Sequence, residues 1–251
     1  MGILAKPMGY LLTWIYDLVG SYGIAILILT IIVKAALYPV YSKQMKSTFK
    51  MSDMSNKVKE IQQKYAKDQA VMNQKIQELY KKEGVSMYGG CLPMIVQMIV
   101  IMGLFTLLRN PITYFNTDDM LFAVHESFLW IKDLAQPDKW VLPIMAGVAT
   151  FISYTMNNMN NMGAGNAATA NNPMASGAMN GFMKYFFPIM ILWFARSYPA
   201  GLAIYWFGSQ VIQIFYNLRF NKWKKDMKAE KLIEEKKKAK RKKAQAQAKA
   251  Q

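Results

Sequence analysis

The sequence has almost none of the residues that build disulfides and transition-metal sites. It contains one cysteine, Cys91, and one histidine, His125, among 251 residues. A single cysteine excludes an internal disulfide and a cysteine-based metal cluster, and a single histidine argues against a histidine-built metal site. We therefore expect the protein to use no metal and no cofactor.

Motifs that would mark an enzyme are also missing. The sequence contains no GxxxxGK[ST], HExxH or GxSxG pattern, which mark nucleotide-binding, zinc-protease and serine-hydrolase sites. The topology predicted below places Cys91 and His125 on opposite sides of a membrane, so these side chains do not form a nucleophilic dyad. We therefore predict that the protein is not an enzyme.

Charged residues are nearly absent from five long stretches and gather between them. The chain is 53% hydrophobic, yet it carries a formal net charge of +16. Apolar blocks separated by charged segments are typical of polytopic membrane proteins, in which a spanning helix needs about 20 apolar residues. The sequence therefore predicts an all-α polytopic membrane protein. Its five transmembrane helices are predicted at residues 20–39, 90–109, 140–156, 182–197 and 200–218.

Residues 40–89 predict a helical hairpin outside the membrane. This segment holds ten lysines and five acidic residues. Two narrow apolar stripes at helical spacing run along it and are interrupted near residues 66–69. We therefore expect two antiparallel helices in water, and the alternative is a solvated spacer. The stripes consist of Met54, Val58, Ile61 and Tyr65, and of Met72, Ile76 and Leu79.

The distribution of lysine and arginine predicts the topology. The tail at 219–251 has 14 basic and four acidic residues, whereas residues 110–139 are poor in lysine and arginine. Cytoplasmic loops carry the excess of basic residues. We therefore expect a multi-pass protein of the cell membrane with its N-terminus outside, an extracellular loop at 110–139, and a cytoplasmic hairpin and tail. No organelle targeting segment is recognisable, which favours a bacterial plasma membrane.

Two further segments complete the predicted organisation. Residues 1–19 place Leu11, Trp14 and Ile15 at helical spacing, which is typical of an amphipathic helix lying in the membrane interface. Residues 157–181 are uncharged and rich in Asn, Gly, Ala and Met, without apolar periodicity. This composition predicts a flexible cytoplasmic loop.

Lys34 is the charge that lies well inside a predicted span. A charged side chain near the bilayer centre costs about 2.5–3.5 kcal/mol on insertion scales. Its long stem allows Lys34 to snorkel to the headgroups near Tyr41 and Lys43. Alternatively, Lys34 lines a wet hollow inside a helical bundle and attracts an acidic group. Both interpretations are open at this point.

Other polar residues within the spans favour the hollow when they are taken together with Lys34. Each of them alone is more often a helix–helix hydrogen bond than a ligand site. If the helices bundle, these side chains and Lys34 form a positive, water-filled hollow open to the cytoplasm, suited to an acidic polypeptide or an anion. The residues are Thr30, Gln97, Thr150, Ser153, Ser209 and Gln210.

Four ordered blocks resemble the YidC/Oxa/Alb family of membrane protein insertases. They are TIIVKAALYP at 30–39, IQELYKKEGVSMYGGCLPMIVQM at 76–98, LWIKDLAQPDKWVLPIMAGV at 129–148 and YPAGLAIYWFGSQ at 198–210. The resemblance implies a five-span core with a cytoplasmic helical hairpin and a hydrophilic groove, open to the cytoplasm and to lipid but closed outside. It also implies that the protein inserts membrane proteins and helps them fold, alone or with the Sec translocon.

The resemblance further implies roles for particular residues. Lys34 matches the position of the groove's positive charge, which is usually arginine in the family; lysine is a point charge without arginine's fork of donors. Thr30 and Gln97 match polar groove positions. Tyr205 and Trp206 match an aromatic pair of the last span that faces passing substrate. The expected substrate-binding groove therefore contains this pair besides Lys34 and the polar residues given above.

The resemblance and the composition together predict the partners. The expected clients are nascent membrane proteins with short acidic translocated segments, and the other expected partners are the Sec translocon, membrane lipids and the ribosome. The basic tail favours either attraction to anionic lipids or binding to ribosomal RNA through counterion release. Two alternative functions are a small anion channel or carrier, for which no internal repeat is visible, and a ribosome-docking membrane scaffold.

Overall fold

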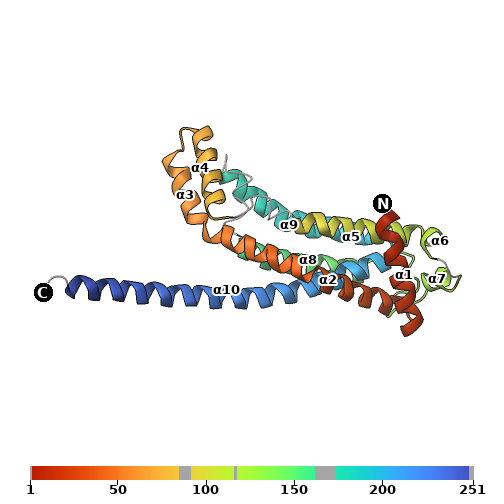
Figure 1. The fold of residues 1–251 in the computed structure, drawn as a ribbon. Helices are drawn as coiled ribbons and strands as arrows, with labels where there is room; N and C mark the ends of the chain where they lie inside the picture. The colour runs from red at the N-terminus through yellow and green to blue at the C-terminus, as the bar shows by residue number, and fades with distance from the viewer. Residues whose placement is uncertain (1, 85–91, 116–117, 162–172, 249–251) are drawn as a thin grey trace. The chain divides into compact units, whose positions relative to one another are not determined.

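A computed structural model describes residues 2–84, 92–115, 118–161 and 173–248, and the regular structure in these ranges is helical (Figure 1). The expected all-α class is therefore confirmed for the described residues. The chain divides into two compact units, Met1–Ile214 and Phe215–Gln251. The helices are α1 Gly2–Val19, α2 Tyr22–Asp53, α3 Ser55–Lys64, α4 Gln69–Lys82, α5 Leu92–Arg109, α6 Pro111–Tyr114, α7 Asp118–Ala123, α8 Val141–Asn161, α9 Pro173–Ser197 and α10 Ala200–Ala248.

α1 ends where Gly20 adopts a left-handed backbone conformation. The φ angle of Gly20 is +63°, and its N–H donates to the carbonyl of Tyr16 at 2.7 Å. Glycine accepts this conformation without the steric cost that a Cβ atom imposes, so it closes the helix C-terminus. The buried face of α1, which includes Leu12 and Ile15, packs against α2 and α5.

α2 is the helix whose length and composition most clearly suit a membrane. Among the described residues, one stretch of a helix, Tyr22–Ser47, is both long and apolar enough to cross a bilayer. Shorter apolar stretches lie in α5, at Gln97–Arg109, and in α8, at Val141–Asn157. The predicted count of five spans therefore stays a prediction. α2 also continues beyond residue 39, since it runs through Pro39 to Asp53.

The helices of the first unit expose apolar side chains on their outer faces. Soluble monomers rarely present extended apolar surface to water. In a bilayer, lipid tails cover such a surface without cost, and helices associate through close packing and polar contacts. The exposed residues include Ile24 and Ile31 on α2, Ile99 on α5, Ile144 and Val148 on α8, and Ile189 and Trp193 on α9.

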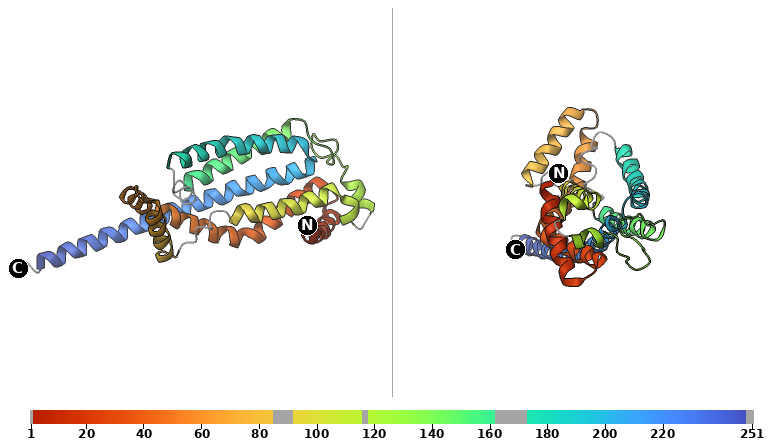
Figure 2. Two further views of the ribbon diagram at one scale, coloured as in Figure 1. Left: turned by 90° about the horizontal axis from the view of Figure 1, so that it is seen from above. Right: turned by 90° about the vertical axis from the view of Figure 1, so that its right-hand side faces the viewer.

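α8 and α9 form the most extensive helix pair, and they lie side by side (Figure 2). Aromatic rings meet between them, with the Phe151 and Tyr185 centroids 6.0 Å apart. Gly147 permits close approach, because a Cβ atom there would lie 3.4 Å from Leu192. The helices therefore pack along a seam that combines small and aromatic residues.

The segment after α7 provides carbonyl groups that accept hydrogen bonds from the first N–H groups of α10. The carbonyls of Leu134 and Gln136 accept from the backbone N–H groups of Gly201 at 3.1 Å and Ala200 at 3.0 Å. The first N–H groups of a helix have no partner within the helix. Residues 134–136 therefore lie at the start of α10.

α3 and α4 pack on each other through the two apolar stripes of residues 40–89. Asp68 begins α4 as its N-cap, because its carboxylate accepts from the N–H groups of Ala70 and Val71, both at 3.1 Å. The small core between the two helices consists of Met54, Val58, Met72, Ile76 and Tyr80, with Ile61, Tyr65 and Leu79 against it. This arrangement is a helical hairpin.

Two segments are more helical than the sequence predicts. The loop expected at 157–181 loses residues at both ends, because α8 continues to Asn161 and α9 begins at Pro173. After Gly147, no glycine or proline occurs in the sequence before residue 163, and proline suits a first helical turn. Residues 162–172 lie outside the described residues. α10 likewise continues past residue 218 to Ala248.

Candidate functional site

Lys34 and Thr30 lie one turn apart on the buried face of α2. Thr30 is fully buried, and its hydroxyl donates to the carbonyl of Ile26 at 2.7 Å, which satisfies it within the helix. Lys34 has an exposed fraction of 9%. A buried ammonium group loses most of its hydration and needs polar groups around it. The polar groups around Lys34 therefore form the candidate functional site.

A chain of hydrogen bonds runs from Lys34 through Gln97 to Tyr205. The Lys34 ammonium donates to Gln97 Oε1 at 3.2 Å, and Gln97 Nε2 donates to the Tyr205 hydroxyl at 3.4 Å. An ammonium group only donates, so the amide oxygen of Gln97 must face it and the amide nitrogen must face Tyr205. The three residues come from α2, α5 and α10. The chain therefore ties three helices together around one cation.

A second polar contact joins α10 to α8. The indole N–H of Trp206 donates to the Thr150 hydroxyl at 2.9 Å, and that hydroxyl donates to the carbonyl of Ala146 at 2.6 Å. Ser209 donates to the carbonyl of Trp206 at 2.9 Å. Tyr205 and Trp206 are adjacent on α10, so one turn of this helix holds Gln97 on one side and Thr150 on the other.

Gly208 lets α10 approach α2 beside the turn that precedes Lys34. A Cβ atom at Gly208 would lie 3.3 Å from a methyl group of Leu27 and 3.7 Å from the methyl group of Thr30. Larger side chains at this position would push α10 away from α2. Close helix approach at a small residue is a usual means of packing in membrane bundles.

The nine predicted groove residues thus fall into three sets. The structure joins Lys34, Gln97 and Tyr205, with Thr30 on the same face as Lys34, and separately joins Thr150, Trp206 and Ser209. Ser153 is buried one turn after Thr150, and Gln210 is half-buried beside Ser209. That these nine side chains line one substrate-binding groove stays a prediction.

Glu126 is a structural residue that the sequence reasoning missed. It accepts hydrogen bonds from the Tyr22 backbone N–H at 2.9 Å and from the Tyr16 hydroxyl. The hydrogen bond to Glu126, together with burial, raises the pKa of Tyr16 to about 12. Glu126 therefore fixes the junction of α1 and α2. It is the one acidic residue at 120–131, a mostly apolar stretch, and that was a usable signal.

Gln44 was also missed by the sequence reasoning. It lies on α2 with an exposed fraction of 6%. Its neighbours in the sequence, Ser42, Lys43 and Lys46, suggest a solvated segment. Burial of Gln44 follows from long-range packing, so no local pattern marks it.

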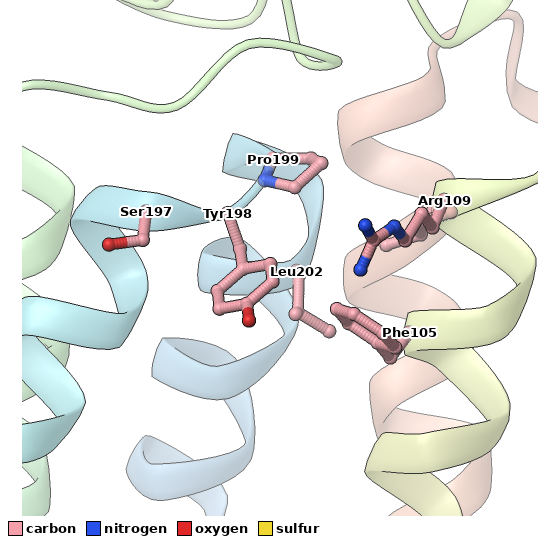
Figure 3. Close-up of a pocket in the computed structure, with 7 residues that line it drawn as sticks. Phe105, Arg109, Ser197, Tyr198, Pro199 and Leu202 are labelled. Atoms are coloured by element: carbon pink, nitrogen blue, oxygen red, sulfur yellow. The ribbon is translucent and has the colours of Figure 1, made fainter.

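A cavity lies at the C-terminal end of α5, whereas Gln97 lies near the N-terminal end of that helix (Figure 3). Its volume is about 340 Å³, and none of the nine predicted residues lines it. The Arg109 guanidinium lies 5.5 Å from the centre of the Phe105 ring, a cation–π distance. The lining residues are Phe105, Leu108, Arg109, Ser197, Tyr198, Pro199 and Leu202.

The described part of the chain contains no cluster of potential metal-binding side chains. Within it, no group of three or more His, Cys, Asp or Glu side chains is placed to hold a metal ion. The site therefore consists of one ammonium group, amides, hydroxyls and an indole. These groups bind and orient polar ligands by hydrogen bonding and charge.

Comparison with known proteins finds membrane proteins that are similar to this chain over most of its length. Residues 14–230 match the model of the family described as 60Kd inner membrane protein. A relative from Caldanaerobacter subterraneus subsp. tengcongensis, named membrane protein insertase YidC, is 34% identical over 233 residues, which cover 92% of this chain and all of the relative. A relative of the same name from Wolinella succinogenes is 34% identical over 219 residues, covering 87% of this chain but only 37% of the relative.

The fold is also similar to that of a solved structure. It is described as an active YidC insertase crystal structure with the first transmembrane domain resolved. Its TM-score is 0.57 at 26% sequence identity, and the match covers 84% of this chain and 45% of that one. This chain therefore spans the full length of some relatives and less than half of others.

Proposed function

Because this chain belongs to the 60Kd inner membrane protein family, in which curated relatives are named membrane protein insertase YidC, we propose that it inserts membrane proteins into the bilayer and helps them fold. The observation that carries the proposal is the buried Lys34 ammonium, which faces the Gln97 amide among α2, α5 and α10. It offers a positive charge below the surface of an apolar bundle.

The first step is the capture of an acidic segment. A short acidic segment of a nascent protein enters a hydrophilic groove from the cytoplasm, and Lys34 attracts its carboxylates. A carboxylate forms a stronger, charge-assisted hydrogen bond to an ammonium group than a neutral amide does. A client carboxylate therefore displaces the Gln97 oxygen from Lys34, while Tyr205 keeps Gln97 in place.

The second step is the transfer of the adjoining apolar segment into lipid. That segment moves along the lipid-facing side of α8 and α10, past Trp206, whose indole is held by Thr150. Partition of about 20 apolar residues into the hydrocarbon core is favourable and drives release. No nucleotide is needed, because burial of the client's apolar surface supplies the driving force.

The surrounding segments receive clients and partners in this proposal. Five spans place the N-terminus outside and the α3–α4 hairpin in the cytoplasm, where the hairpin and residues 157–181 meet the incoming chain first. The basic tail binds the ribosome or anionic lipid. The protein works alone or beside the Sec translocon, and the nine groove residues named above contact the client.

Insertion by purified protein in liposomes tests the proposal. The client is a single-span protein with a short acidic tail, and protection of that tail from added protease is the readout. We expect Lys34→Arg to keep activity and Lys34→Met, which is neutral and of similar length, to lose at least about tenfold, since a hydrogen bond to a charged group is worth about 1.5–3 kcal/mol.

Two controls make the result specific. A client whose acidic residues are replaced by asparagine should insert equally with wild type and Lys34→Met, because its tail carries no charge for Lys34 to attract. Size-exclusion profiles of the variants should match that of the wild type. Equal insertion of the acidic client by all three proteins would contradict the role of Lys34, and no insertion by any of them would contradict autonomous insertase activity.

A further inference from the structure

The chain between α7 and α8 makes a tight turn with an apolar tip. Phe128 and Ile131 form an isolated antiparallel bridge, in which each N–H donates to the other residue's carbonyl, at 2.8 and 2.9 Å. Leu129 and Trp130 are the two central residues. Glycine and asparagine are preferred at the centre of two-residue turns. A leucine and a tryptophan are therefore unusual at the centre of this turn.

Leu129 is unusual in both its backbone and its exposure. Its φ angle is +54°, and it is the non-glycine residue with a positive φ in the described part of the chain. A leucine in this left-handed region is strained, because its Cβ atom crowds the backbone. Its side chain is nevertheless 76% exposed, and that of Trp130 is 45% exposed. In water, both side chains would leave apolar surface exposed.

The base of the turn is fixed firmly to the bundle. The Phe128 ring occupies the space left by Gly23, where an added Cβ atom would lie 2.3 Å from the ring. Ile131 is buried, with an exposed fraction of 6%. Two residues before Phe128, Glu126 accepts from the Tyr22 backbone N–H. The turn is therefore held rigidly, and its exposed tip is not a result of disorder.

The contacts of this segment set its level along the bundle. Gly23 and Tyr22 are the first residues of α2, and the carbonyls of residues 134 and 136 accept from the first N–H groups of α10. The turn thus lies level with the starts of both α2 and α10. If these helices span the bilayer, their starts lie at its surface, and so does the tip.

We propose that the Phe128–Ile131 turn is a membrane anchor, in which Leu129 and Trp130 insert into the interfacial region of the outer phospholipid leaflet. Tryptophan prefers the headgroup level, where its ring is apolar and its N–H is hydrated. The exposed Lys132 follows the tip, and its ammonium suits lipid phosphates. Lipid supplies the burial that the strained leucine lacks in water. The anchor rests on the chain being embedded in a bilayer, and it adds a lipid contact that the insertion mechanism does not use.

Spin-label depth measurements test the anchor in the full chain. In a Cys91→Ser background, nitroxides are attached at Leu129→Cys, at Ser127→Cys and at Ile31→Cys, one site per protein. The purified proteins are placed in nanodiscs of phosphatidylethanolamine and phosphatidylglycerol. Power saturation then compares collisions with oxygen, which concentrates in lipid, and with a water-soluble nickel chelate.

The three sites separate the possible outcomes. We expect the ratio of oxygen to nickel collisions to be several-fold higher at 129 than at 127, an exposed polar site two residues away, and higher still at 31 on the outer face of α2. A lipid-like ratio at 31 with a water-like ratio at 129 overturns the anchor and leaves the insertase proposal standing. Water-like ratios at both sites overturn the embedding of α2 as well.

A second variant guards against disruption of the turn by the label. Trp130→Cys places the nitroxide on the neighbouring tip residue, whose backbone does not have a positive φ. A lipid-like ratio at 130 supports the anchor even if labelled Leu129→Cys fails to fold, and water-like ratios at every tip site that folds overturn it. No client and no translocon is present in the nanodiscs, so a lipid-like ratio identifies lipid as the occupant.

Discussion

The helical bundle and the α3–α4 hairpin both have an apolar core but expose opposite kinds of surface. The bundle exposes isoleucine, valine and tryptophan on its outside and holds Lys34, Gln97 and Thr150 in contacts between helices. The hairpin hides its apolar stripes and exposes ion pairs such as Lys57–Glu83 at 2.8 Å. Apolar outer faces suit lipid and charged outer faces suit water, so the difference indicates that one chain is built for two solvents.

The sharpest way to break this comparison is to place a charge on each outer surface. Ile31→Asp changes a 57% exposed residue of α2. If lipid covers this face, an aspartate there costs about 3 kcal/mol, and we expect a large loss of folded protein from the membrane fraction. The measurement is the amount of monodisperse protein extracted from membranes.

The matched control is Gln63→Asp on the exposed face of α3. Water covers this position, so the yield should equal that of the wild type. Equal yields for Ile31→Asp and Gln63→Asp would show that the outer face of α2 does not face lipid.

The hairpin core predicts the next largest effect. Ile76 has an exposed fraction of 2% between α3 and α4. Ile76→Ala removes buried methyl groups and leaves a cavity, at a cost of about 2 kcal/mol or more. We expect amides of both hairpin helices to lose hydrogen-exchange protection in the full chain, while amides of α8 and α9 keep theirs.

The control for this change is Gln77→Ala, which truncates an exposed neighbour on the same helix. It should leave exchange of the hairpin unchanged. If Ile76→Ala also leaves the hairpin amides protected, the apolar cluster does not hold the two helices together.

The smallest effect is expected at the hairpin's outer ion pair. Lys75 donates to Glu78 at 2.7 Å, and this hydrogen bond lowers the pKa of Glu78 and raises that of Lys75. A lowered carboxyl pKa adds stability at neutral pH, which is lost as the pH falls through the folded pKa. Because water screens exposed pairs, we expect Glu78→Gln to leave hairpin exchange at pH 7 unchanged. A clear loss of protection would show that the pair is shielded from solvent.

Much of the fold could be predicted from local patterns. The apolar run after Gly20 predicts α2, and stripes with steps of three and four predict α3 and α4. An amide inside a span, Gln97, was a sound candidate partner for Lys34, because polar groups in apolar segments need one another. These inferences depend on spacing along one helix, which the sequence shows directly.

The remaining features depend on contacts between distant segments. The Trp206–Thr150 hydrogen bond and the two bonds of Glu126 link residues far apart in the sequence, so no periodicity reveals them. The turn at Leu129 contradicts ordinary turn composition, which a pattern-based prediction follows. A leucine there costs about 1–2 kcal/mol in backbone strain. Features of this kind become visible only when the chain is folded.

The segment at 126–139 holds the helices of the bundle together at one of its two ends. This one stretch binds the start of α2 through Glu126, the start of α10 through two carbonyls, and the end of α9, where Arg196 donates to the carbonyl of Lys139 at 3.1 Å. Helices that are joined by hydrogen bonds at one end can move apart more easily at the other end. A chain that enters between them would therefore meet the least resistance far from this junction and the most beside it.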